Sequence, residues 1–422
     1  MHKLYCKCIC VSLKHAIIDK LHGSIFGATP GDRCVFIQTQ CVNIMRQCHK
    51  YRVPLAMATL DISRAFATVP HCTVVQSLVD LDAPPALIAL VSAEIGGNSL
   101  NIRVMGGARL KIAMERGIVE GSPFSMVLIL CVQSMLIRRL LSDPTFCEAL
   151  ARLPPAPNCM EVCIEPMVWV DDLTLTASSS DGLQRQVTIV NAALRQINMN
   201  FKVKKFHWMT TDSMKTLEIW HEGTAIRKQE SLNVLGLEVC HNGSPHFAIS
   251  ARRAAATAKW FSLARDANFH KLALHTIYRL HNTMYLPSMA YGISAYPMST
   301  SLLQDISKGS SSHILQYHRR PQHMDVGSWI RTVRGRLRTK RLDGSLRTRI
   351  QHIVNDLRAL HDFARRDRGR QLERILNWRN AAWRATVDRN VRPQQRRSGD
   401  HAELCLLGTD LEFLGFLRLH VA

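Results

Sequence analysis

Hydrophobic and polar positions alternate along the first half of the chain with a mixture of helical and strand periods. Apolar residues recur at helical spacing over 71–79 and again over 84–95, a segment opened by two prolines, which predicts two helices. Residues 101–114 form two runs of β-forming residues separated by Gly106-Gly107, which predicts a hairpin with a two-glycine turn. This pattern favours a structure that mixes helices and strands.

The most apolar part of the chain follows that hairpin. Ser122 and Pro123 are predicted to be the N-cap and first-turn residues of a helix running from Phe124 to about Leu140. The apolar run is too short to cross a bilayer, so we expect this helix to be buried inside the protein. Five prolines then fall within residues 144–166, which predicts an irregular insertion.

Acidic residues stand at the ends of two predicted strands. Asp171-Asp172 lies between β-forming residues in the segment 167–176 and predicts a tight hairpin with two carboxylates at its tip, while Asp61 follows the apolar run 54–60. An Asp-Asp pair alone is as well explained by a polar turn. Two strand ends, however, can bring three carboxylates together. Such oxygen ligands suit Mg²⁺, and two ions about 3.5–4 Å apart can clamp the attacking and leaving oxygens of a phosphoryl transfer.

Positive charge is concentrated near the C-terminus. The 422 residues carry a formal net charge of +21, and residues 319–397 hold 22 Lys and Arg against 7 Asp and Glu, a difference of +15. Apolar residues recur there at helical intervals from Ile350 to Leu360 and from Leu372 to Leu376, which predicts helices with basic outer faces. Because acidic partners are too few, nucleic-acid contact is favoured over a solvated helical surface. An anionic membrane surface is the second candidate.

The cysteines bear on the cellular environment and on metal binding. Their number, 13, is odd, and they are scattered along a long chain, which is typical of an intracellular, reducing environment. No CxxC spacing occurs, so the sequence gives little support to a zinc site. We expect neither a signal peptide nor a membrane span.

Segments in series resemble the motifs of one enzyme family, the reverse transcriptases of non-LTR (LINE-type) retrotransposons. The family's palm segments LDLSKAFDTVPH, GVRQGCPLSP and YADDL resemble, in this order, residues 60–71 (LDISRAFATVPH), 116–125 (RGIVEGSPFS) and 169–173 (WVDDL). The family's lysine motif, its YLG segment and its thumb segment RPVLLYG are similar to residues 205–209 (KFHWM), 235–237 (LGL) and 285–292 (YLPSMAYG). The resemblance covers roughly residues 23–329.

The resemblance implies an α+β right-hand polymerase core with a basic helical C-terminal extension. Partial fingers would occupy residues 1–50, a palm with an antiparallel sheet 51–230, a helical thumb 231–318 and the extension 319–422. The implied activity is RNA-directed DNA synthesis on an RNA template, with a DNA primer and deoxynucleoside triphosphates. Residues 26–33 (FGATPGDR) resemble the family's fingers segment FGFRPGRS. Because little chain precedes them, we further expect a core cut from a longer element. The lifestyle of such elements implies nuclear residence.

The resemblance also assigns a metal site. Asp61 and Asp171 would hold two Mg²⁺ or Mn²⁺ ions, joined by the main-chain carbonyl of Ile62. Asp172 would stand nearby as a supporting acid. These four positions carry the expected chemistry.

Three further positions have both a family role and an ordinary explanation. Lys205, with Lys204 as the neighbouring candidate, would protonate or neutralise the departing pyrophosphate, whereas a lysine pair alone indicates a solvated edge. Phe66 would block a ribose 2′-hydroxyl, the group by which RNA and DNA substrates differ, or would simply pack in the core. Gly121 would let the backbone approach the nucleotide or template, or would form a plain turn before the next helix.

Two departures from the family pattern keep alternatives open. Glu120 replaces the expected Gln, and another carboxylate near a triphosphate is electrostatically unfavourable; Thr29 stands where an Arg is expected. The first alternative is a catalytically inactive, degenerate nucleic-acid-binding remnant of such an element. The second is a palm polymerase that copies RNA into RNA. Primer extension tests the first alternative, and discrimination between deoxynucleotides and ribonucleotides tests the second.

Overall fold

The computed structural model describes most of the first 296 residues and a few positions beyond them. The described residues are 2–27, 31–97, 99–103, 109–119, 121–154, 161–211, 218–265, 272–296, 325, 328, 356, 359–360, 362–363 and 370–375. Thr29, Glu120 and most of the predicted basic extension lie outside them, so the predictions made for these positions stay predictions.

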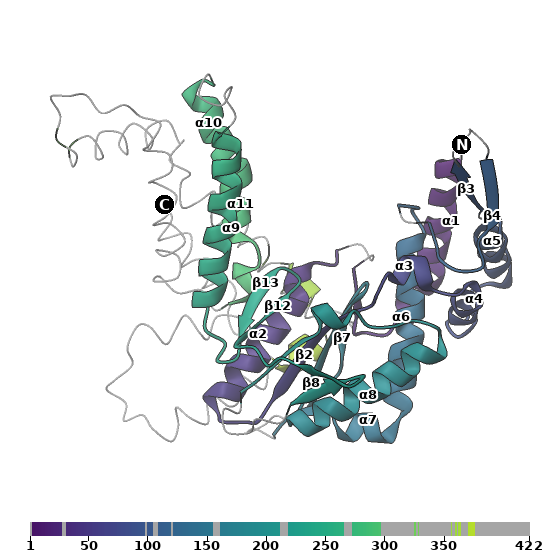
Figure 1. Cartoon of the computed structure of the whole chain (residues 1–422), viewed down its shortest axis with the longest axis horizontal. Helices are drawn as coiled ribbons and strands as arrows, with labels where there is room; N and C mark the ends of the chain where they lie inside the picture. Colours follow the sequence, from purple (N-terminus) through teal and green to yellow (C-terminus); the bar gives the residue numbers. More distant parts are fainter. Residues whose placement is uncertain are drawn as a thin grey trace.

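Helices and strands alternate along the described chain. Figure 1 shows a central sheet between a group of helices near the N-terminus and a column formed by α9, α10 and α11. Up to residue 142 the elements are α1 (His2–Ile17), η1 (Ile18–Lys20), β1 (Ile25–Phe26), α2 (Cys34–Lys50), β2 (Ala56–Asp61), α3 (Ala65–Thr68), α4 (His71–Val79), α5 (Pro85–Gly96), β3 (Ser99–Arg103), β4 (Arg109–Ala113) and α6 (Ser125–Ser142). The helices predicted over 71–79 and 84–95 are thus confirmed.

The later elements are shorter, apart from two long helices. They are α7 (Pro144–Glu148), β5 (Ala151–Leu153), β6 (Val162–Ile164), β7 (Met167–Trp169), β8 (Asp172–Ala177), α8 (Ser180–Gln196), η2 (Val203–Lys205), β9 (His207–Thr210), β10 (Ile219–His221), β11 (Thr224–Ile226), β12 (Ser231–Val234), β13 (Leu237–Cys240), α9 (His246–Ala264), α10 (Leu274–Leu280), the π-helical η4 (His281–Tyr285), α11 (Leu286–Ala290) and η5 (Ile293–Ala295). The π-helical turn η4 continues α10 directly into α11.

The central sheet has five strands in the order β1-β7-β8-β2-β9. All neighbours are antiparallel except β1 and β7, which run parallel. The acid-tipped hairpin predicted from the sequence is therefore β7 and β8, and it pairs with β2 along the whole length of that strand. The mixed helix and sheet architecture around an antiparallel sheet agrees with the predicted α+β polymerase core.

The two faces of this sheet pack against different layers. Leu60 of β2 and Leu173 of β8 lie in a first hydrophobic core with residues of α6 and α8. Met57 and Met209 point to the opposite face, because side chains alternate along a strand, and lie in a second core with α2, β12, β13 and α9. The sheet is thus buried on both faces.

The apolar helix α6 is buried as predicted, but it begins later than predicted. With 18 residues it is long and apolar enough to cross a membrane, which differs from the length expected from the sequence, but 72% of these residues are buried inside the protein, as in the core helix of a soluble domain. The predicted cap at Ser122 and Pro123 is wrong, because Phe124 occupies the N-cap position without a side-chain bond. The amide of Ser122 instead donates to the carbonyl of Val119, which forms a turn before the helix.

The proline-rich insertion contains more regular structure than predicted. Asp143 accepts hydrogen bonds from the amides of Thr145 and Phe146, and Pro144 takes the first helical position, where its missing amide costs nothing. The strands β5 and β6 then pair as an antiparallel hairpin. The irregular insertion predicted for this region is therefore wrong in part, because a proline that ends one helix can also start the next.

The antiparallel pairing of β3 and β4 confirms the predicted hairpin. Its register runs from Ser99 opposite Ala113 to Arg103 opposite Arg109. The predicted turn at Gly106-Gly107 lies outside the described residues and stays a prediction.

Part of the predicted extension packs onto the second core. Phe363 stacks on Phe36 of α2 with ring centroids 4.1 Å apart and planes at 11°, and it meets Phe26 of β1 at 5.6 Å. Leu372 and Ile375, which the sequence predicts on an apolar helix face, are fully buried. We call the described residues 356, 359–360, 362–363 and 370–375 the C-terminal segment.

Polar contacts anchor the C-terminal segment to the same surface. The side-chain amide of Gln371 donates to Gln40 Oε1 at 3.0 Å, and its oxygen accepts from the main-chain amide of Glu165 at 2.9 Å. Asp356 pairs with Arg33 at 3.0 Å. These bonds join positions far apart in the sequence, so the segment forms part of the folded core.

Candidate active site

Three aspartates are brought close in the fold where β2 ends and β8 begins. Asp61, the last residue of β2, lies directly opposite Asp172, the first residue of β8, in the antiparallel register. Asp171 lies in the two-residue turn between β7 and β8, and its carbonyl accepts a hydrogen bond of 3.2 Å from the amide of Ile62. The sequence-predicted convergence of Asp61 with the Asp171-Asp172 turn is therefore observed. The metal-binding roles of these three residues stay predictions.

The turn that carries these acids has an unusual backbone. Val170 has φ of 57°, a left-handed conformation that a β-branched side chain rarely adopts. Its amide donates to the carbonyl of Phe26 at 3.2 Å, and a Cβ placed on Gly27 would lie 2.6 Å from its Cγ2 atom. Gly27 itself has φ of 121°. The side chain of Val170 thus fits only because residue 27 is glycine, a dependence that no local sequence pattern predicts.

Lys205 supplies a positive charge at the same place. It ends η2 and forms an ion pair with Asp61, whereas no ion pair is recorded for Lys204 among the described residues. The side chain of Asp61 is only 10% exposed, but that of Lys205 is 58% exposed. The hydrogen bond to Asp61 raises the pKa of Lys205 above its usual range. Of the two candidate lysines, the structure therefore brings Lys205 to the acids.

One ammonium group does not balance three carboxylates. Partial desolvation, followed by the negative charges of Asp171 and Asp61, raises the pKa of Asp172 to about 6. Desolvation and the Asp61 charge also raise the pKa of Asp171. Lys205 opposes both shifts. The site therefore holds excess negative charge at neutral pH, and a bound cation would relieve it.

This excess charge predicts that Asp172→Asn stabilises the fold at neutral pH. A carboxyl with a raised pKa binds its proton more tightly in the folded state, so its stabilising effect is present below about pH 4 and is lost as pH rises through about 6. Without divalent ions we expect a gain in unfolding free energy of about 1 kcal/mol at pH 7.5, kept small by screening of the exposed side chain. Urea unfolding measures it, and a gain as large at pH 4 would contradict the electrostatic explanation.

The three carboxylates limit the kind of metal site that can form here. Within the described part of the chain, no three His, Cys, Asp or Glu side chains are grouped closely enough to surround a single metal ion. Mg²⁺ does not require such a cage, since it commonly uses one or two carboxylates and completes its shell with water and substrate phosphates. The opposed Asp61 and Asp172, the adjoining Asp171 and the raised pKa values of Asp171 and Asp172 fit this mode.

Phe66 and Gly121 lie on two segments that are joined by a hydrogen bond and a close backbone contact. Phe66, in α3, is half-buried against the first core, and its carbonyl accepts from the amide of Ile118 at 2.7 Å. Gly117, next to Ile118, has φ of 83° and comes so close to Ala67 that a Cβ would lie 2.8 Å from the Ala67 carbonyl. Gly117 thus allows the two backbones to approach each other closely, a requirement that the sequence analysis did not identify.

Gly121 differs from Gly117 in its surroundings. It also has φ of 83°, but a Cβ placed on it would meet no atom within 4 Å. Its glycine is required by the backbone conformation, and the open space beside it leaves room for a ligand. The roles assigned to Phe66 and Gly121 stay predictions.

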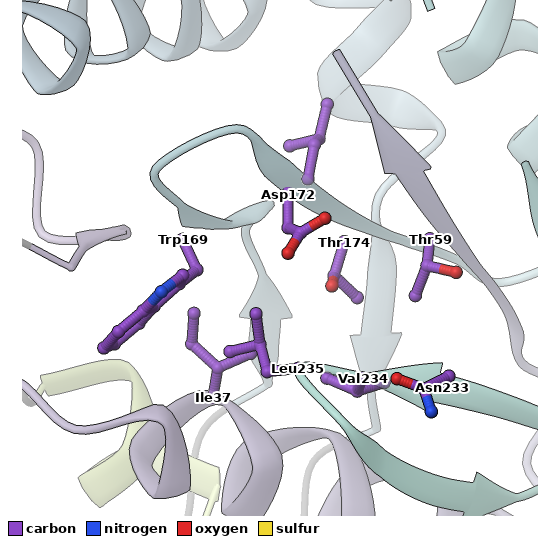
Figure 2. Close-up of a pocket in the computed structure, with 9 residues that line it drawn as sticks. Ile37, Thr59, Trp169, Asp172, Thr174, Asn233, Val234 and Leu235 are labelled. Atoms are coloured by element: carbon purple, nitrogen blue, oxygen red, sulfur yellow. The ribbon is translucent and has the colours of Figure 1, made fainter. Parts of the chain in front are cut away.

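A hollow opens beside Asp172. Figure 2 shows Asp172, Thr174 and Thr59 on one wall, facing Asn233 and Leu235 of the β12–β13 hairpin. The residues that line the hollow are Ile37, Thr59, Trp169, Asp172, Leu173, Thr174, Asn233, Val234 and Leu235. Thr59 and Thr174 are paired opposite each other, two positions from Asp61 and Asp172, so strand alternation places them on the acid-bearing face. That spacing was the available signal for two residues that sequence reasoning missed.

Known proteins with similar sequences come from one class of mobile element. The chain is 27% identical over 158 residues to the "Retrovirus-related Pol polyprotein from type-2 retrotransposable element R2DM" of Drosophila melanogaster, a match that covers 37% of this chain and 14% of that protein. It is 25% identical over 153 residues to the corresponding type-1 R2 polyprotein of Nasonia vitripennis, which covers 36% and 14%. The match therefore spans about a seventh of these relatives.

Solved structures with some likeness include telomerases. The apo telomerase of Candida tropicalis has a TM-score of 0.41 at 10% identity over 93% of this chain and 59% of that chain, and the Candida albicans enzyme has 0.38 at 10% over 74% and 51%. These values are too low to support an argument. The family described as "Reverse transcriptase (RNA-dependent DNA polymerase)" matches residues 3–239, more than half of the chain. With the carboxylates and Lys205 inside that range, the chain belongs to the reverse transcriptase family, and the predicted resemblance to the non-LTR group is confirmed.

Proposed function

We propose that this chain catalyses RNA-templated DNA synthesis. The 3′-hydroxyl of a DNA primer attacks the α-phosphate of a deoxynucleoside triphosphate, a phosphodiester bond forms and pyrophosphate leaves. The observation that supports this most directly is the meeting of Asp61, Asp171 and Asp172 with Lys205 at one end of the central sheet. Only folding brings these positions together, and they fall within the part of the chain that matches the family.

The acids would serve as ligands for divalent cations, which reverse transcriptases use in general. We propose that Asp61 and Asp171 hold two Mg²⁺ or Mn²⁺ ions with the carbonyl of Ile62, and that Asp172 supports them with its charge. Such ions, when bound, activate the attacking hydroxyl and neutralise charge on the phosphate and leaving oxygens. The contribution of the protein is to hold the carboxylates in place on two paired strands before the substrates arrive.

Lys205 would act on the leaving group. Its ammonium pairs with Asp61 and is largely exposed, so it can turn from that carboxylate towards a triphosphate without breaking buried contacts. There it would neutralise the departing pyrophosphate or donate a proton to it. Because its pKa is raised, Lys205 stays protonated at neutral pH, as this role requires.

The partners follow from the family and from charge. Reverse transcriptases bind RNA templates; we propose that this chain also binds a DNA primer and deoxynucleoside triphosphates. Its net charge of +21 supports binding to phosphates that weakens as salt concentration rises and depends little on sequence. The division into fingers (1–50), palm (51–230), thumb (231–318) and extension (319–422), and nuclear residence, stay proposals.

Primer extension tests the proposed activity. The full chain is incubated with a labelled DNA primer on an RNA template, all four deoxynucleoside triphosphates and Mg²⁺ or Mn²⁺. We expect template-dependent elongation that stops when the divalent ion is chelated. Tight binding of the primer–template without any elongation would overturn the proposal and favour the inactive, nucleic-acid-binding remnant.

Gly27→Ala is expected to lower extension activity by displacing the acid-bearing turn. The added Cβ would lie 2.6 Å from Val170 Cγ2, and misplacement of catalytic groups by about 1 Å can cost about 10²-fold in rate. Val170→Ala in the same chain removes the clash, so partial recovery is expected, limited by the remaining strain at φ of 121°. Gly223→Ala, at φ of 75° with no atom near its Cβ, is the control for strain alone. If Gly27→Ala and Gly223→Ala lose the same amount of extension activity, the proposed steric mechanism is contradicted.

Phe66→Ala tests the choice of sugar. The measured quantity is the kcat/KM for ribonucleotides divided by that for deoxynucleotides. If the ring blocks a 2′-hydroxyl, this ratio is expected to rise by about tenfold or more in the variant. Single-nucleotide extension with each substrate measures the ratio. A wild-type ratio no better than that of the variant would remove the gate role, leaving core packing as the explanation. Preference of the wild type for ribonucleotides would instead favour an RNA-copying polymerase.

A further inference from the structure

A carboxylate of the C-terminal segment is shared between two distant parts of the fold. Asp356 Oδ1 lies 3.0 Å from Nη1 of Arg33, the residue that directly precedes α2. The hydroxyl of Ser294, in η5, donates to Asp356 Oδ2 at 2.9 Å. One side chain of the C-terminal segment therefore binds both the start of α2 and η5.

The two contacts of Asp356 differ in how easily another group can replace them. Ser294 is buried, with 1% exposure, so its hydroxyl fixes one carboxylate oxygen from inside the protein. The side chain of Arg33 is 44% exposed and that of Asp356 is 27% exposed. Ion pairs with this exposure contribute little to stability, because water and salt screen them. A second anion can therefore compete with Asp356 for Arg33 at small cost.

Arg33 stands close to the proposed active site. The next residue, Cys34, begins α2, and burial together with the negative charge of Asp172 raises the pKa of its thiol. One turn further along the helix, Ile37 lines the hollow with Asp172 and Trp169, as Figure 2 shows. Arg33 is thus carried by the end of α2 that borders the hollow.

The place of α2 relative to Lys205 indicates which phosphate Arg33 would meet. In the strand order, Lys205 stands by Asp61 near the edge strand β9, whereas α2 borders the sheet at Asp172 and at Trp169 of β7. Lys205 is assigned to the departing pyrophosphate in the proposed reaction. Attacking and leaving oxygens of an in-line displacement lie on opposite sides of phosphorus, so a phosphate beside α2 would belong to the primer–template.

We propose that Arg33 binds a backbone phosphate of the primer–template and that Asp356 occupies this position in the free protein as an autoinhibitory contact. A guanidinium group binds carboxylates and phosphates through the same N–H donors, so the two anions exclude each other at Arg33. This inference rests on the proposed binding of a primer–template. It adds a binding residue to the site, and a carboxylate 323 positions away whose charge opposes binding.

Binding of a labelled primer–template by the full chain tests this contact without turnover. Fluorescence anisotropy gives the Kd over a series of KCl concentrations, with EDTA present to remove divalent ions. Asp356→Asn keeps an oxygen that can accept from Ser294 but removes the charge that pairs with Arg33. We expect its Kd to fall by up to about fivefold, the factor that an exposed ion pair is worth, with the salt dependence of Kd unchanged.

Arg33→Gln is expected to have the opposite effect. The loss of one phosphate contact should raise the Kd and reduce the slope of log Kd against log salt concentration by about one. The control for net charge is Glu161→Gln, which opens the similarly exposed 3.0 Å pair of Glu161 with Arg152 at the β5–β6 hairpin. In the Arg33→Gln chain, adding Asp356→Asn should change the Kd no more than this control does.

The outcomes separate this inference from the proposed function. Equal changes in Kd for Asp356→Asn and Glu161→Gln, or an unchanged salt slope in Arg33→Gln, overturn the inference. An effect of Arg33→Gln confined to the KM of the deoxynucleotide in primer extension also overturns it, because the phosphate at Arg33 would then belong to the triphosphate. The expected pattern of binding in a chain that extends no primer overturns the polymerase function alone. Failure to bind any primer–template overturns both.

Discussion

Asp171→Asn is expected to reduce primer extension by about 10³-fold or more without unfolding the protein. Asparagine keeps the size of the side chain and fits the turn, but it removes one negative charge from the proposed metal site. The turn stays attached to β2 through the bond from the amide of Ile62 to the main-chain carbonyl of residue 171, which the substitution leaves in place. Single-turnover extension with saturating primer–template measures the chemical step directly.

A matched control and a second readout distinguish a lost ligand from a damaged fold. Asp181→Asn makes the same change at an exposed carboxylate of α8 that pairs with Arg185 at 2.8 Å, and it should leave extension near the wild-type level. Mg²⁺ should raise the thermal midpoint of the wild type and of Asp181→Asn, because a ligand that binds only the folded state stabilises it. The midpoint of Asp171→Asn should respond less. Wild-type extension rates in Asp171→Asn would eliminate Asp171 as a metal ligand.

The parts of the site that could be predicted from the sequence are those defined by local pattern. Asp61 at the end of an apolar run and Asp171-Asp172 between β-forming segments are short-range signals, and strand geometry then limits where the carboxylates can lie. The same holds for Thr59 and Thr174, which alternation would have placed on the acid-bearing face. Local spacing also gave the helices α4 and α5.

The parts that escaped prediction depend on contacts between distant positions. The crowding of Val170 against Gly27 and the bond from Tyr291 to Leu235 join residues whose own neighbourhoods carry no sign of each other. Long-range packing thus fixes the fine geometry of this site, while local pattern fixes its composition.

Phe363→Ala is expected to lower the free energy of unfolding by about 3–5 kcal/mol. The side chain is 4% exposed and lies against both Phe36 and Phe26, so its removal loses buried apolar surface and leaves a cavity between α2 and β1. Because the carbonyl of Phe26 accepts from the amide of Val170, this cavity would also loosen support for the acid-bearing turn. The effect is large because the C-terminal segment completes the second core.

The urea midpoint of the full chain measures this loss, with Glu373→Ala as the control. Glu373 lies in the same segment but is exposed, so its truncation should change stability by no more than about 0.5 kcal/mol. If Phe363→Ala unfolds at the same urea concentration as Glu373→Ala, the C-terminal segment does not pack on the core in solution. A large drop in the urea midpoint of Phe363→Ala alone would show that the C-terminal segment contributes to the fold that supports the acids. This segment lies more than a hundred residues beyond the end of the family match.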